Sequence, residues 1–166
     1  MTSFRGRQPV WARNGGAARE WSSSAIMFAV LDTNHFREYS HASVSGGRLM
    51  AKIEAEKPDL FACIVAAEES LSGWIAFVRQ HRAGIDQLKG YERLHACIET
   101  LGKLTLLPFD REAAMIFHEL VQTHPRIGTM DLKIAAICLE HDATLLTRNL
   151  LDFEKIPGLR VENWLD

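Results

Sequence analysis

Asp32 is an acidic residue at the end of an apolar segment. It directly follows Phe28–Leu31, an apolar run that is typical of a buried parallel strand. In open α/β sheets, ligands bind at the carboxyl ends of the strands. A carboxylate buried there destabilises the fold unless another group pairs with it. We therefore expect Asp32 to belong to a functional site.

Asp131 is a second acid in an unusual place. It lies three, four and seven residues before Ile134, Ala135 and Cys138, so it shares the apolar face of its helix. An acid in the first turn of a helix complements the helix dipole. The dipole does not explain why this acid faces inward, and we expect Asp131 to meet Asp32.

A pair of glutamates offers a third acid. Glu68 and Glu69 follow a strand-like segment and open a helix, where either can simply complement the dipole. Helical spacing places Glu68 beside Ile64 and Glu69 beside Val65. Periodicity therefore does not choose between the two glutamates.

Further polar groups follow a later strand. Thr147 ends that strand, so Thr147 and Asn149 should lie on the same edge of the sheet as Asp32. Asp152 is either part of the same site or an ordinary acid of a helical turn. Arg148 lies between Thr147 and Asn149 and is either a phosphate contact or an exposed, solvated side chain.

Carboxylates that converge on one edge repel each other and take up protons unless a cation neutralises them. Mg²⁺ and Mn²⁺ prefer such oxygen ligands, and either can activate water for phosphodiester hydrolysis. A zinc site is not expected, because the sequence has no CxxC or HExxH motif. Its three cysteines are far apart, and we expect them to be buried thiols in a reducing cytosol.

Composition limits the class of protein. Apolar residues make up 47% and charged residues 24%, which is typical of one globular domain. No apolar run approaches the ~20 residues that span a bilayer, so no membrane is expected. The net charge is −2, which excludes coating of nucleic acid by bulk charge.

The N-terminal residues 1–26 differ from the remainder. They carry four arginines against one glutamate, a net charge of +3, so the remainder carries −5. The segment is rich in glycine and serine and has no apolar period, so we predict a disordered extension. We expect Met27 to be the natural start, and residues 27–166 to form one domain.

Short apolar runs alternate with helical patterns along that domain, which indicates an α/β fold with a parallel sheet. The expected strands are Phe28–Leu31, Leu60–Val65, Leu104–Leu107, Thr144–Thr147 and Leu159–Val161. Four helices are expected at Thr33–Tyr39, Arg48–Lys57, Ala66–Gln80 and Ile85–Leu101. Two more should follow, one capped by Asp110 that runs to Gln122 and one capped by Thr129 that runs to His141, and then a helical turn at Leu150–Phe153. The segment His41–Gly47 is expected to be a loop. We predict a three-layer sandwich, a central sheet of four to five strands with helices on both faces.

Several of these motifs, in this order and at these distances, resemble one known family. They are Leu31–Asn34, the acid before Gly73, Asp131–Ala136, Thr144–Asn149 with Asp152–Phe153, and Ile156–Trp164. Together they resemble the PIN domain, and more narrowly the VapC-type toxins of type II toxin–antitoxin systems. The resemblance covers Met27 to Asp166.

The resemblance implies a PIN-like fold and Mg²⁺- or Mn²⁺-dependent cleavage of RNA that leaves a 5′-phosphate. It implies Asp32, Glu69 and Asp131 as catalytic acids that hold the metal. Glu69 is favoured because the second acid of the family usually lies four residues before a glycine, here Gly73. Glu68 is the alternate.

The chain departs from the family at the fourth acidic position. Asn149 occupies a slot that often holds aspartate, and an amide brings no charge. Asp152 is an additional candidate metal ligand. The resemblance further implies that Asn34 orients Asp32, that Thr147 hydrogen-bonds within the site, and that Arg148 contacts a substrate phosphate.

The resemblance also implies partners. A small antitoxin protein would lay an amphipathic helix in an apolar groove beside the site. Helical segments around Leu49–Ile53, Trp74–Phe77 and Leu88–Ile98 could build that groove, or be ordinary core. A homodimer and a cytoplasmic location are expected. Two other functions stay open: an RNA-processing PIN nuclease without an antitoxin, and a PIN-fold module that binds RNA or protein without cleaving, for which Asn149 is the only support.

Overall fold

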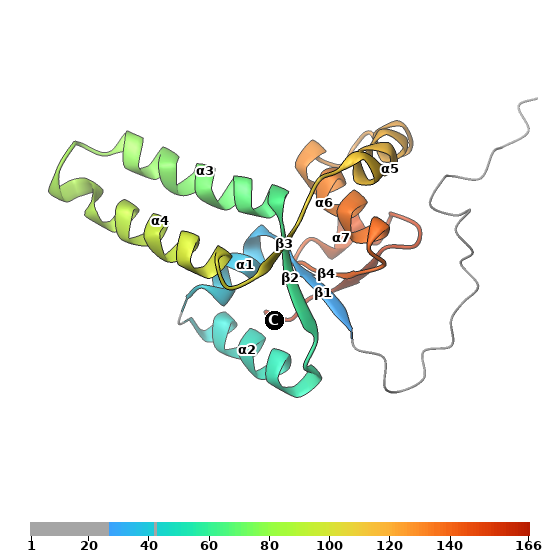
Figure 1. The fold of residues 1–166 in the computed structure, drawn as a ribbon, viewed down its shortest axis with the longest axis horizontal. Helices are drawn as coiled ribbons and strands as arrows, with labels where there is room; N and C mark the ends of the chain where they lie inside the picture. Colours follow the sequence, from blue (N-terminus) through green and yellow to red (C-terminus); the bar gives the residue numbers. More distant parts are fainter. Residues whose placement is uncertain (1–26, 42) are drawn as a thin grey trace, which may run out of the picture.

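The computed structural model describes residues 27–41 and 43–166, so the extension predicted for residues 1–26 lies outside the described residues. A five-stranded sheet forms the centre of the molecule (Figure 1). Its strands are β1 (Phe28–Leu31), β2 (Asp59–Cys63), β3 (Thr105–Leu107), β4 (Thr144–Leu146) and β5 (Arg160–Glu162). They run in the order β3-β2-β1-β4-β5 and every pairing is parallel.

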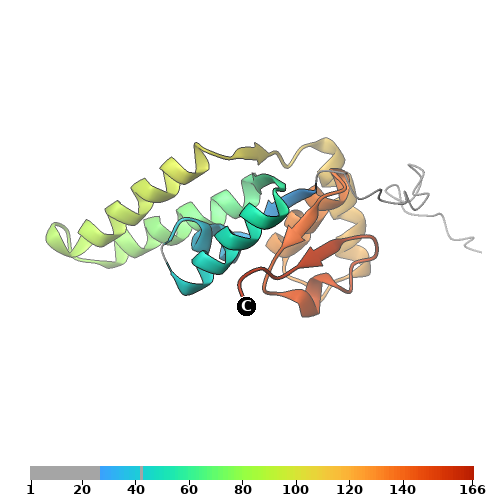
Figure 2. The ribbon, with the colours of Figure 1, turned by 90° about the horizontal axis from the view of Figure 1, so that it is seen from below.

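Helices connect the strands and cover both faces of the sheet (Figure 2). They are α1 (Thr33–Tyr39), α2 (Val44–Glu56), α3 (Ile64–Gln80), α4 (Leu88–Leu101), α5 (Arg111–Thr123), α6 (Thr129–Glu140) and α7 (Leu150–Phe153), with a 3₁₀ turn at Ile85–Gln87 before α4. This arrangement confirms the predicted α/β sandwich.

Alternation along the central strand gives each face its own core. Val30 of β1 packs into a cluster with buried side chains of α5 and α6, whereas Ala29 and Leu31 join a second cluster on the other face. That second cluster includes side chains of α1, α2 and α4 together with the C-terminal Trp164 and Leu165. The C-terminus therefore belongs to the packed core beside α1.

The strand order reverses between β1 and β4. From β1 the chain moves outward to β2 and β3 on one side, and later returns to place β4 and β5 on the other. The backbone N–H of Asp32 donates to the carbonyl of Leu146, 3.1 Å away, which ties the carboxyl ends of β1 and β4 together. Such a reversal opens a crevice in which ligands bind.

The structure corrects three local predictions. Residues Val44–Gly47, predicted as loop, form the first turn of α2, because the Ser43 hydroxyl accepts a hydrogen bond from the Gly46 N–H. Residues Ile64 and Val65 belong to α3 rather than to β2, because the Cys63 sulfur caps that helix. Thr129 is the first residue of α6 and not its cap, since Gly128 holds the cap position.

Helices α3 and α4 form a long antiparallel hairpin that projects from the sheet (Figures 1 and 2). The two helices approach closely at Gly90, where a Cβ atom would lie 2.6 Å from Val78 and 2.8 Å from Phe77. The outer side of α4 exposes a stripe of apolar side chains at helical spacing, Leu88, Tyr91 and Ile98.

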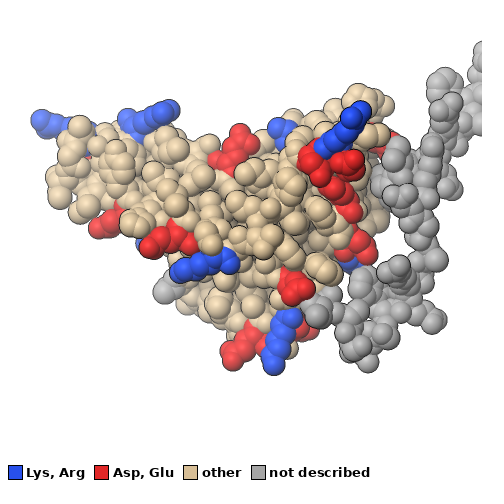
Figure 3. All heavy atoms as spheres, in the orientation of Figure 1, with Lys and Arg blue, Asp and Glu red and all other residues tan. Residues whose placement is uncertain are grey.

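Within the described residues, no helix is long and apolar enough to cross a bilayer. Figure 3 shows basic and acidic side chains scattered over the face drawn there, with broad uncharged areas between them. This face therefore has no single basic surface of the kind that binds nucleic acid by charge alone.

Candidate active site

Asp32 begins the site at the carboxyl end of β1. It is the N-cap of α1, and its Oδ1 accepts a hydrogen bond from the backbone N–H of His35 at 2.8 Å. The Nδ1 atom of His35 lies 3.2 Å from the same oxygen. Asp32 is only 6% exposed, and its two donors among the described residues both bond to Oδ1, so Oδ2 has none there. That oxygen is available to a ligand.

The structure distinguishes between the two glutamates. Glu69 is half-buried in α3 and accepts a hydrogen bond from the hydroxyl of Thr33, the residue after Asp32. Glu68 is exposed. Glu69 is also among the charges that act on Asp131, and Glu68 is not. The structure therefore places Glu69, and not Glu68, beside the other acids.

Asp131 lies in the first turn of α6, near the negative charges of the other acids. Burial raises the pKa of its carboxyl, and the nearby charges of Glu69, Asp152 and Asp32 raise it further. A hydrogen bond from Asn149 acts in the opposite direction. Three acids from separate elements thus act electrostatically on Asp131 at one end of the sheet.

Asn149 connects two of these acids. Its Nδ2 lies 3.2 Å from Oδ2 of Asp152 and 3.4 Å from Oδ2 of Asp131. The fully buried Thr147 holds this loop, because its hydroxyl accepts the Asn149 backbone N–H at 3.0 Å. Lys155 binds the other oxygen of Asp152 at 2.8 Å, and this bond together with that from Asn149 lowers the pKa of Asp152.

These groups fit a divalent cation chemically. All the acids supply oxygen ligands, and their mutual repulsion is the cost that a cation would remove. The side chains that would hold it are Asp32, Glu69 and Asp131, with Asn149 and Asp152 at the edge of the set. The observation that supports this fit is the nearly buried carboxylate of Asp32, whose Oδ1 accepts both donors of His35 and whose Oδ2 has no donor among the described residues.

Two residues that the resemblance assigned to the site have other surroundings. Asn34 is exposed, and no hydrogen bond joins it to Asp32 among the described residues. Arg148 donates to the hydroxyl of Ser45 at 3.1 Å and pairs with Asp166 at 3.2 Å on the surface. A substrate phosphate would therefore compete with Asp166 for this guanidinium.

His35 is the site residue to which sequence reasoning gave no role. Its side chain is fully buried, contacts Asp32 through Nδ1, and accepts the backbone N–H of Trp164 at Nε2, 3.2 Å away. One signal was present in the sequence. A polar side chain three residues after an N-cap commonly reaches back to the cap, as in a capping box.

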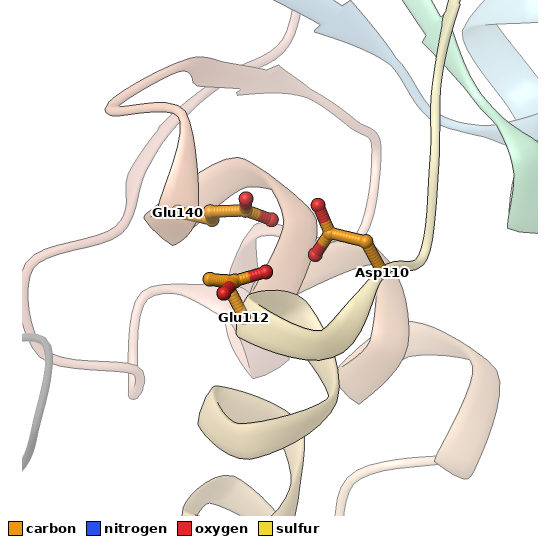
Figure 4. Close-up of side chains that lie close together, drawn as sticks. All are labelled: Asp110, Glu112 and Glu140. Carbon is orange, nitrogen blue, oxygen red and sulfur yellow. The ribbon is translucent and has the colours of Figure 1, made fainter.

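A second acidic group lies elsewhere, between α5 and α6 (Figure 4). Asp110, Glu112 and Glu140 are the one group in the described chain that brings three ligand atoms within 4.8 Å of one another. Glu140 is nine residues beyond Asp131 on α6, about 14 Å along the helix axis. Asp110 caps α5 and Glu112 lies in its first turn, so both already stabilise that helix.

A pocket of about 270 Å³ opens beside the acids, between α1, α3 and α4. Thr33 and Glu69 line it where it borders the acids, and Phe36, Trp74, Phe77 and Cys97 give it an apolar lining together with Arg37 and Arg93. Two of the three predicted groove segments, those around Trp74–Phe77 and Leu88–Ile98, contribute to this pocket. The segment Leu49–Ile53 does not.

The PIN domain family model matches residues 29–159. This match covers most of the chain and every element that carries the acids, so the chain belongs to the PIN domain family. Among curated proteins it is similar to Ribonuclease VapC1 of Rickettsia felis, with 37% identity in an alignment of 86 residues that covers 47% of this chain and 64% of that protein. It is also similar to the tRNA(fMet)-specific endonuclease VapC of Salmonella typhimurium, with 33% identity over 49% of this chain and 65% of that protein. The chain thus spans a little under two thirds of the curated relatives that it matches.

Solved structures share the fold over more of the chain. VapBC-1 from nontypeable Haemophilus influenzae gives a TM-score of 0.67 at 18% identity, covering 84% of this chain and 100% of that one. VapBC2 from Rickettsia felis, bound to a DNA fragment from its promoter, gives 0.64 at 23% identity over 83% of this chain and 99% of that one. These likenesses confirm the PIN-like fold.

Proposed function

We propose that this chain is a Mg²⁺- or Mn²⁺-dependent endoribonuclease and the toxin of a toxin–antitoxin pair. The observation that carries the proposal is the electrostatic coupling of Asp131 to Asp32, Glu69 and Asp152 at the crevice between β1 and β4. Two of the curated relatives are named as a ribonuclease and a transfer-RNA endonuclease, which supports RNA as the substrate.

The roles of the side chains follow from their contacts. Asp32, Glu69 and Asp131 would hold the cation, which when bound would supply Lewis-acid stabilisation and a water of lowered pKa. Thr33 orients Glu69 through a hydrogen bond, and the amide of Asn149 holds Asp131 and Asp152 close together through two more. Arg148 stands at the edge of the same loop as the candidate phosphate contact.

The test is cleavage of RNA by the purified chain. Asp32→Asn and Asp131→Asn should each abolish cleavage while the thermal midpoint of unfolding stays within a few degrees of the parent's. Asp86→Asn, an exposed acid before α4, is the matched control and should cleave like the parent. Chelation by EDTA should stop cleavage, and added Mg²⁺ or Mn²⁺ should restore it. Cleavage by either site variant at the parent's rate would contradict the proposal.

The proposed partner is a small antitoxin whose apolar side chains enter the pocket between α1, α3 and α4. Trp74 and Phe77 supply apolar surface, and Glu69 connects the pocket to the acids, so an occupant would also obstruct the site. A structurally similar assembly from Klebsiella pneumoniae, with a TM-score of 0.60, is a toxin–antitoxin complex, which supports such a partner.

Co-expression with the product of a neighbouring small gene tests this partner. The complex should co-purify at a fixed stoichiometry and show little cleavage. Ala96→Trp, which fills the pocket from α4, should weaken that inhibition at least tenfold, measured relative to the cleavage by the free variant itself. Equal inhibition of the parent and this variant would place the antitoxin elsewhere.

A homodimer and a cytoplasmic location belong to the same proposal. The stripe of Leu88, Tyr91 and Ile98 on α4 is exposed and apolar, which suits an interface. Light scattering should give twice the chain mass, and Tyr91→Glu should give the monomer.

The three free, buried cysteines support a reducing compartment.

A further inference from the structure

We infer that His35 is a positioning residue that fixes the first metal-binding acid by connecting it to the C-terminal segment. This inference rests on the proposed function, since it assigns Asp32 to the metal. It concerns a side chain that touches neither substrate nor metal and acts through Asp32 alone.

The two ring nitrogens of His35 have different partners. The backbone N–H of Trp164 donates to Nε2 at 3.2 Å, so Nε2 carries no proton. In the neutral ring the proton is then on Nδ1, which donates to Oδ1 of Asp32 at 3.2 Å. The hydrogen bond from Trp164 therefore sets the tautomer that Asp32 requires.

The ring cannot move independently of its surroundings. His35 is fully buried in α1, and Phe36 beside it is 2% exposed. Trp164 and Leu165 are themselves buried in the core cluster that includes β1. A side chain held on both sides in this way restricts the rotation of its partner, here the carboxylate of Asp32.

Both donors from His35 go to the same oxygen of Asp32. The backbone N–H and the ring Nδ1–H each bond to Oδ1, which leaves Oδ2 for the cation. Outer groups that orient a ligating side chain in this way typically change metal affinity by 10- to 100-fold when they are replaced. The backbone donor remains in any variant of His35, so the expected change lies near the lower end of that range.

Two conservative substitutions separate the two contacts. The amide of His35→Asn replaces Nδ1 and keeps the donor to Asp32, but it does not reach Trp164. The amide of His35→Gln replaces Nε2 and keeps an acceptor for Trp164, but it loses the donor to Asp32. Exposed His95 on α4 provides the matched control, His95→Asn.

The experiment is Mn²⁺ titration followed by electron paramagnetic resonance, together with thermal unfolding and RNA cleavage. His35→Gln should bind Mn²⁺ about tenfold more weakly and lose kcat with little change in KM for RNA. His35→Asn should bind Mn²⁺ within about twofold of the parent, although both variants lower the thermal midpoint. His95→Asn should change none of these values.

Two outcomes would overturn the inference alone. One is Mn²⁺ affinity in His35→Gln equal to the parent's, and the other is an affinity loss that simply follows the thermal midpoint across both variants. If the parent itself bound no Mn²⁺, the proposed metal-dependent function would fail and this inference with it.

Discussion

The side-chain amide nitrogen of Asn149 donates hydrogen bonds to two acids, to Oδ2 of Asp152 at 3.2 Å and to Oδ2 of Asp131 at 3.4 Å. It opposes the effect of burial and of the neighbouring carboxylates on the pKa of Asp131. A neutral donor at this position therefore holds two anions close to each other. It does this without adding a third negative charge.

Replacement of Asn149 by Asp should exchange that stabilisation for stronger metal binding. In EDTA the added charge should lower the thermal midpoint by several degrees, because it repels Asp131 and Asp152. With Mg²⁺ or Mn²⁺ the midpoint should recover, and Mn²⁺ should bind about tenfold more tightly. Asn163→Asp, which also removes an amide donor to an aspartate, is the control and should respond equally with and without metal. A loss of Mn²⁺ affinity in Asn149→Asp would contradict this role.

Thr147 should support catalysis through Asn149. Thr147→Val keeps the buried shape but removes the acceptor for the Asn149 N–H, at a cost of about 1–3 kcal/mol. We expect kcat for RNA to fall about tenfold, and Thr147→Ser to retain the parent's value. Thr144→Val removes another buried hydroxyl, at the opposite end of β4, and should lower stability without lowering kcat. Equal kcat in the parent and Thr147→Val would show that this loop needs no such support.

Asp166 should limit the access of RNA to Arg148. The pair is exposed, so Asp166→Asn should leave the thermal midpoint nearly unchanged. It should lower KM for RNA about twofold, and more at low salt, where charges are less screened. Asp142→Asn breaks a comparable surface pair with Arg160 and should leave KM unchanged. An increase in KM would indicate that Asp166 positions Arg148 instead of competing for it.

Glu140 should make stability depend on pH. Burial raises the pKa of its carboxyl; His141 opposes this, and Asp110 and Glu112 add to it. The folded chain therefore binds this proton up to a higher pH than the unfolded chain does, and stability is lost as the pH rises through that range. Glu140→Gln should unfold about 2–4 °C higher than the parent at pH 7, which corresponds to about 1 kcal/mol at this size.

The same substitution should give a smaller gain at pH 4, where the unfolded parent as well as the folded parent carries most of this proton. Glu154→Gln, on an exposed residue after α7, is the matched control and should show no such difference between the two pH values. A midpoint for Glu140→Gln below the parent's at pH 7 would contradict the sign of the effect.

The sequence by itself determined most of the elements and pointed to two of the acids. The apolar run Phe28–Leu31 predicts strand β1, because a strand whose two faces are covered by helices is apolar along its length. Asp32 and Asp131 were recognisable because each breaks an apolar pattern that its own segment defines. These are local signals, and neither depends on knowing which segments meet.

Tertiary structure alone decided the rest. Glu68 and Glu69 are equivalent in periodicity, and only the approach of α1 and α6 places Glu69 beside Thr33 and Asp131. The donor to Nε2 of His35 lies 129 residues away in the sequence, and the two partners of Arg148 lie 103 and 18 residues away. Contacts over such separations depend on how the sheet and its helices pack, and no pattern within one segment specifies them.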